Sequence, residues 1–199
     1  MKIGMIFECG PDGADLQVCD ALGKLLNPQV VVASVTLDNK PKLIRECGKV
    51  AKQLLEVDRC AHILIIWDLY PAWRERDARP CRKQDREAIL GSLRGAKVSR
   101  SRVTPVCIRE ELEAWLIADG RALSTVLSTA AHPTRVSHEN RPEQVRNPKK
   151  TLIRLFNRSR HRTYVDRYHA IQIVRALPDL GRLLRLPTFQ RFSARLLAD

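Results

Sequence analysis

The sequence HILIIWD, at residues 62–68, decides the fold class. An uninterrupted apolar run follows the histidine, and an aspartate ends it. A nearly continuous run that is rich in isoleucine is typical of a strand buried on both faces of a parallel sheet. The same pattern predicts three more such strands, at residues 2–7, 30–36 and 103–108.

Helix-forming stretches separate these runs. Residues 15–26, 41–57 and 85–93 carry apolar side chains at helical spacing. Alternation of strands and helices implies right-handed crossover connections, and therefore a parallel sheet. We expect an α/β domain with three Rossmann-like layers and a mainly parallel four-stranded sheet.

The pattern changes after the fourth apolar run. A short helix is predicted first, and a polar segment that contains several prolines follows it. The remaining chain predicts further helices. These expected helices are residues 110–119, 149–156, 166–176 and 187–197.

Charge divides the chain into two parts. Residues 1–120, the expected α/β core, carry 19 Lys and Arg against 17 Asp and Glu. Residues 121–199, an expected helical C-terminal extension packed on the same domain, carry 16 against 5. A surface rich in arginine concentrates polyanions such as nucleic acid. It also suits solubility or an acidic protein partner, and these alternatives stay open.

Composition points to a cytoplasmic protein. No stretch approaches the roughly 18 apolar residues of a membrane span, and the first residues do not resemble a secretion signal. The 6 cysteines include no CxxC pair, so neither a zinc site nor a disulfide framework is indicated. We expect reduced, structural cysteines.

Carboxylates follow the ends of the predicted strands. Glu8 ends the first run, Asp68 ends the third, and Glu111 and Glu113 come soon after the fourth. Ligands of an open parallel sheet bind beyond the carboxyl ends of its strands, so these side chains are expected to meet. Crowded carboxylates repel one another unless a cation neutralises them, and their oxygens suit Mg²⁺ or Mn²⁺.

Each carboxylate also has a structural interpretation. Asp12 or Asp15 is expected to cap the helix that follows the first strand. Glu110 and Glu111 would stabilise a helix N-terminus by their charge. Glu113 would simply be solvated. A purely structural role is weakest as an explanation for Glu8 and Asp68, because each directly ends an apolar run.

A family resemblance adds to these patterns. Residues 111–119 read ELEAWLIAD, which resembles the ELEAWLLAD signature of the uncharacterised domain-of-unknown-function family 4276. The resemblance covers most of the chain, although only the Glu-Ala-Trp-Leu segment is distinctive alone. The features that agree with it are Glu8 with Gly10-Pro11, Asp68, Asn147-Pro148-Lys149, Tyr164 before His169-Ala170, and Phe189 with Phe192.

That family resembles Toprim-like proteins of prokaryotic defence modules. The resemblance implies that Glu8 is a general acid/base and that Asp68 is a metal ligand. The second motif of Toprim-like proteins is Asp-x-Asp. Asp68 matches its first aspartate, but Tyr70 occupies the position of the second. Replacement metal ligands would be Glu113 or Asp119. Relatives are often encoded beside ATPases, which implies an ATPase partner.

The extension contains a dense basic run that is expected to contact a nucleic-acid backbone. A solvated helix face is the alternative interpretation. The expected contact residues are Lys149, Lys150, Arg154, Arg158, Arg160 and Arg162.

The carboxylates at the strand ends predict a Mg²⁺ or Mn²⁺ site, and the resemblance implies a Toprim-like, metal-dependent nuclease of prokaryotic anti-phage or mobile-element defence. Its predicted catalytic residues are Glu8 and Asp68. The alternatives are an inactive Toprim-derived module that binds an ATPase or nucleic acid, and a phosphoryl-transfer enzyme with Asp68 as nucleophile.

Overall fold

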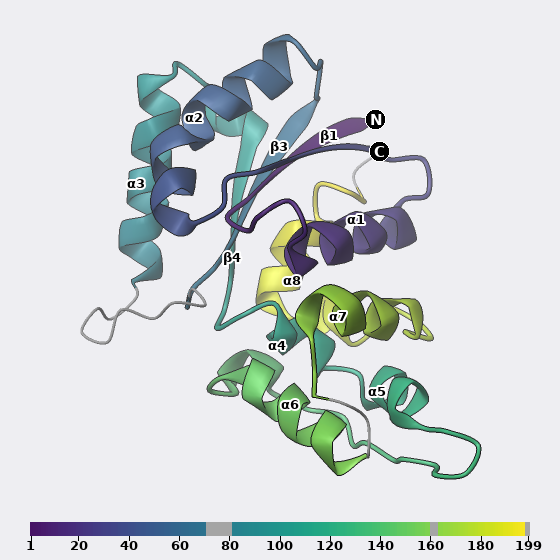
Figure 1. Ribbon diagram of the computed structural model, residues 1–199. Helices are drawn as coiled ribbons and strands as arrows, with labels where there is room; N and C mark the ends of the chain where they lie inside the picture. The colour runs from purple at the N-terminus through teal and green to yellow at the C-terminus, as the bar shows by residue number, and fades with distance from the viewer. Residues whose placement is uncertain (71–80, 160–162, 198–199) are drawn as a thin grey trace.

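A computed structural model describes residues 1–70, 81–159 and 163–197 (Figure 1). Four strands form one sheet, and every neighbouring pair is parallel. The order across the sheet is β2-β1-β3-β4. The strands are β1 (Lys2–Phe7), β2 (Val31–Thr36), β3 (His62–Asp68) and β4 (Val103–Ile108).

Helices cover both faces of the sheet, as Figure 1 shows. Helices α2 (Lys40–Glu56) and α3 (Arg82–Gly95) pack on one face. Helix α1 (Ala14–Leu26) packs on the other, where α7 (Asp166–Arg175) of the C-terminal part contacts α1 and α8 (Pro187–Ser193) contacts β4. The other helices of the C-terminal part are α4 (Glu113–Leu116), α5 (Gly120–Leu127) and α6 (Pro148–Arg158). The predicted three-layer α/β architecture is confirmed.

The central strands bury side chains on both faces because each face is covered by helices. In β1, Met5 and Phe7 belong to the core beneath α1, whereas Ile6 belongs to the core beneath α2. Full burial of one such side chain stabilises the fold by about 1.5–3 kcal/mol.

The C-terminal part joins the core beneath α1. Trp115 contacts Phe189 and Phe192 of α8, with ring centroids 5.1 and 5.6 Å apart. Helix α7 packs along α1, and α8 packs on β4. All 6 cysteines lie in the described residues and are free. No helix among those residues is long and apolar enough to cross a membrane.

Three predictions about the helices and strands differ from the structure. Strand β2 was expected to be buried on both faces, but it is an edge strand, and Val31 is 56% exposed. The single helix expected at residues 110–119 is instead the short α4, because Asp119 ends that stretch and caps the unpredicted α5. The last predicted helix is also shorter, since α8 ends at Ser193.

The strand order fixes where a ligand would bind. The chain leaves β1 through α1 on one face of the sheet and leaves β3 towards α3 on the other (Figure 1). The connections therefore diverge between the carboxyl ends of β1 and β3. Such a switch point is the usual ligand site of an open parallel sheet.

Candidate functional site

A hollow of about 220 Å³ lies at this switch point, and we call it the acidic pocket. Its carboxylates come from the strand ends, from α1 and from the C-terminal part, and one lysine joins them. They are Glu8, Asp15, Asp38, Asp68, Glu113 and Asp166, with Lys149.

Glu8 and Asp68 are linked directly at the floor of the pocket. The Asp68 backbone N–H donates to Glu8 Oε1 at 2.8 Å. The other oxygen of Glu8, Oε2, and Asp68 Oδ1 are buried and have no hydrogen-bond partner among the described residues. A buried acceptor left unpaired costs roughly 1–3 kcal/mol. The pocket thus keeps acceptors that the described chain does not satisfy.

A tight turn brings Asp15 to the same place. Gly13 N–H donates to Gly10 O at 2.9 Å, and a Cβ on Gly13 would lie 2.5 Å from Cys9 Sγ. Only glycine therefore fits this turn. The next residues start α1, whose first turn carries Asp15.

Burial changes the proton affinity of these three carboxyl groups. It raises the pKa of Glu8 to about 7, although Lys40 and the Asp68 N–H oppose the shift. It raises the pKa of Asp15 to about 6. The pKa of Asp68 is well above its usual range because of burial and the neighbouring charges of Asp15 and Glu8. Some of these groups therefore hold a proton near neutral pH unless a cation neutralises them.

Lys40, whose charge lowers the pKa of Glu8, forms its hydrogen bonds with other groups. Lys40 Nζ donates to Leu69 O at 2.9 Å and to Asp85 Oδ2 at 3.2 Å. Trp67 Nε1 donates to the same Asp85 oxygen at 3.2 Å. Lys40 thus fixes the chain after β3, and its charge is shared with Asp85.

The opposite wall of the pocket contains its own cation. Lys149 Nζ lies 2.5 Å from Asp166 Oδ2 and 3.9 Å from Glu113 Oε1. Burial raises the pKa of Glu113 to about 7, against the effect of Lys149. The Tyr164 hydroxyl is buried without a well-formed hydrogen bond among the described residues, and burial and Glu113 raise its pKa. Lys149 thus compensates part of the negative charge of Asp166 and Glu113. The buried oxygens Glu8 Oε2 and Asp68 Oδ1 have no such partner among the described residues.

The donor chemistry of the floor fits a hard cation. Carboxylate oxygens are the ligands that Mg²⁺ prefers, and it commonly binds one or two of them while it keeps several waters. Glu8 Oε2 and Asp68 Oδ1 provide two such oxygens. No group of three or more His, Cys, Asp or Glu side chains in residues 1–70, 81–159 and 163–197 is already gathered for a metal ion. Water or substrate would therefore complete the coordination.

Comparison with protein families matches residues 16–197 to a family described as a domain of unknown function, DUF4276. The chain belongs to this family. The matched residues of DUF4276 include Asp68, Glu113 and Lys149, whereas Glu8 precedes them. No curated protein and no solved structure matches the chain. The function therefore has to be argued from the site.

The structure brings several predicted site residues of this DUF4276 chain together. Glu8, Asp68, Glu113 and Lys149 all line the acidic pocket. Asp119 does not line it. Its carboxylate caps α5, accepting from Arg121 N–H at 2.8 Å, and Arg121 Nη2 lies 2.6 Å from its other oxygen. A bound, structural carboxylate of this kind is not a candidate metal ligand.

The pocket also contains residues that the sequence did not predict for it. Asp15 was expected to cap α1, but Gly13 is the N-cap, and Asp12 is exposed. Asp166 comes from α7, nearly a hundred residues after β3. Asp15 could have been found from its place in the loop after the first strand, whereas Asp166 carries no such local signal.

The predicted basic residues of α6 separate into two groups. Lys149 faces the pocket, whereas Lys150, Arg154 and Arg158 are exposed. Arg160 and Arg162 lie outside the described residues. Tyr70 is described, and its N–H donates to Glu110 O at 3.0 Å. Its phenol provides no carboxylate at the second-motif position.

Proposed function

We propose that this protein is a divalent-metal-dependent nuclease that hydrolyses phosphodiester bonds of nucleic acid in the acidic pocket. The supporting observation is the pair of buried, unpartnered oxygens of Glu8 and Asp68 at the switch point of the sheet. The resemblance to Toprim-like proteins of defence modules extends the proposal to a cytoplasmic role with an ATPase partner.

Glu8 and Asp68 would hold the ion, Mg²⁺ or Mn²⁺. When bound, such an ion polarises a phosphodiester and lowers the pKa of a bound water. Without a cation the pKa of Glu8 is about 7, and a bound ion would lower it, so that Glu8 would be ionised and able to accept a proton at neutral pH. Its hydrogen bond from Asp68 N–H holds the carboxyl group in one orientation.

The lysine-containing wall would have a different part in the reaction. Lys149 already compensates Asp166 and lies near Glu113, so these carboxylates are poorer cation ligands than Glu8 and Asp68. The pKa of Glu113, about 7, suits a second proton-transfer group on the far side of the substrate.

The test is cleavage of labelled single- and double-stranded DNA and RNA with Mg²⁺ or Mn²⁺ and with a chelator. Glu8→Gln keeps the acceptor for Asp68 N–H but removes the proton-transfer group, and we expect a loss of about 10²–10⁴-fold in rate. Glu87→Gln, an exposed change on α3, is the matched control. Cleavage that needs no divalent ion, or that survives Glu8→Gln, would refute the proposal.

A second candidate function is a non-catalytic module that binds nucleic acid or an ATPase. The observation that favours it is Tyr70 in place of a carboxylate, together with the lack of a preformed three-ligand group in the described residues. This candidate predicts salt-sensitive binding of nucleic acid, no heat of Mg²⁺ binding and no turnover.

A further inference from the structure

Helix α6 has one buried side and one basic side. Leu152 and Phe156 are buried in the core. Lys150, Arg154 and Arg158 are exposed and stand four residues apart. Residues at this spacing lie on the same side of a helix. We call these three residues the α6 basic face.

The charges of the α6 basic face are not used within the described chain. None of the three side chains forms an ion pair with a described residue, and Arg154 only donates to Thr151 Oγ1, at 3.2 Å. Their neighbour Lys149 behaves differently, since it points into the acidic pocket and pairs with Asp166. The α6 basic face is therefore available to an external anion.

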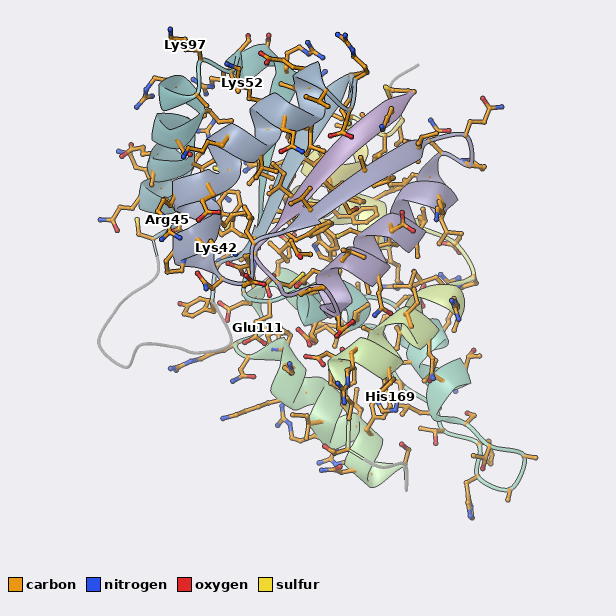
Figure 2. All side chains as sticks on the ribbon, turned by 45° about the horizontal axis from the view of Figure 1, so that its top comes forward. Lys42, Arg45, Lys52, Lys97, Glu111 and His169 are labelled. Atoms are coloured by element: carbon orange, nitrogen blue, oxygen red, sulfur yellow. The ribbon has the colours of Figure 1, made fainter. Side chains whose placement is uncertain are left out.

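The position of α6 connects this face to the pocket. Asn147 caps the helix, and its Oδ1 accepts from Lys150 N–H at 3.1 Å. The first turn of α6 lies at the pocket, because Lys149 in that turn lines it. Figure 2 shows α6 beginning near Glu111 and running away from the sheet. From Lys150 to Arg158 the helix rises about 12 Å. Phosphates of one duplex strand follow one another at about 3.4 Å along the axis, so this length spans three or four of them.

We propose that the α6 basic face docks the backbone of a polynucleotide whose next phosphodiester enters the acidic pocket beside Lys149. The proposal rests on the proposed function and specifies its substrate as a chain of several nucleotides rather than a small phosphate ester. The pocket alone is rich in carboxylates and repels phosphates. Contacts along α6 offset this repulsion only for a substrate long enough to reach both places.

The test compares two triple variants that each lose three positive charges. One changes Lys150, Arg154 and Arg158 to Gln. The matched control changes Lys49, Lys52 and Lys97, which line a hollow of about 510 Å³ between α2 and α3. Figure 2 shows Lys52 and Lys97 at the end of the molecule opposite to α6.

Binding of fluorescent single-stranded DNA and RNA of about 20 nucleotides is measured in a chelator over a range of salt concentrations. The plot of log K against log [salt] falls with salt, and loss of three phosphate contacts makes its slope less steep by about 2. At about 0.1 M salt this corresponds to an affinity that is roughly 100-fold weaker. We expect this loss for the α6 variant and less than about threefold for the control. Circular dichroism checks that both variants are folded.

Equal losses in the two variants would show that only net charge matters and would overturn the proposal. So would unchanged binding by the α6 variant. Wild-type protein that binds polyglutamate but neither nucleic acid would assign the face to an acidic protein instead. Because binding in a chelator requires no catalysis, the docking result stays separate from the Glu8→Gln result that tests the nuclease.

Discussion

The acidic pocket and the start of α5 bury carboxylates in opposite ways. Asp119 is fully buried, yet its oxygens receive the Arg121 N–H and guanidinium, and Arg121 outweighs the cost of burial and lowers the pKa of Asp119. Asp68 has a buried oxygen without a hydrogen-bond partner among the described residues, and its pKa is raised. The first arrangement stabilises the fold, and the second costs stability.

The comparison shows that burial alone does not mark a functional site. The charge of Asp119 is neutralised by Arg121, two residues further along the chain, so this carboxylate needs no ligand from outside the protein. At Glu8 and Asp68 the nearby Lys40 is shared with Asp85. Retaining charges that the fold does not compensate is expected where something from outside binds.

The largest expected effect is on the compensated side. Asp119→Ala removes the cap of α5 and the buried partner of Arg121, and should lower the free energy of unfolding by about 2–4 kcal/mol. Urea denaturation near neutral pH measures it. Asp20→Ala, which removes an exposed pair with Lys24, should cost less than about 0.5 kcal/mol. If Asp119→Ala lowered the free energy of unfolding as little as Asp20→Ala, the carboxylate of Asp119 would not stabilise the fold and the contrast with the acidic pocket would be wrong.

The second effect has the opposite sign. Because the pKa of Glu8 is raised from 4.5 to about 7 in the fold, its ionisation destabilises the native state as the pH rises through that interval. Glu8→Gln should therefore stabilise the metal-free protein by about 2–3 kcal/mol near pH 8, and by almost nothing near pH 4. Denaturation in a chelator at both values tests this. A destabilised variant near pH 8 would contradict it.

The smallest effect concerns the partly compensated wall. Lys149→Gln removes the pair with Asp166 and the attraction to Glu113, but Lys149 and Asp166 are partly exposed, and Lys149 lies 3.9 Å from the buried Glu113. A loss of only about 1 kcal/mol in the free energy of unfolding is expected. A loss as large as that of Asp119→Ala would place this wall with the structural carboxylates.

Much of the sheet was predictable because it depends on local pattern. The runs that form β1 and β3 are nearly continuous and apolar, as strands buried on two faces require. The edge position of β2 was not predictable, since its own residues resemble those of a central strand and only the neighbouring strands decide the order.

The site was predictable only in part, for a related reason. Glu8 and Asp68 were found because parallel strands end on the same edge of a sheet. Asp119 follows an apolar stretch as they do, and only the pairing with Arg121 distinguishes it. Asp166 enters the pocket because α7 packs along α1, a contact between distant parts of the chain that no local pattern records.

The most direct test of the unpartnered carboxylates is calorimetric titration of Mn²⁺ into the protein near pH 6.5, in two buffers with different heats of ionisation. We expect saturable binding with release of protons, because Glu8, with a pKa of about 7, must ionise to bind the ion. Asp68→Asn should abolish this binding, and Glu87→Gln should preserve it. The absence of saturable heat in the wild type, or equal binding by Asp68→Asn, would contradict the assignment of these carboxylates to a cation.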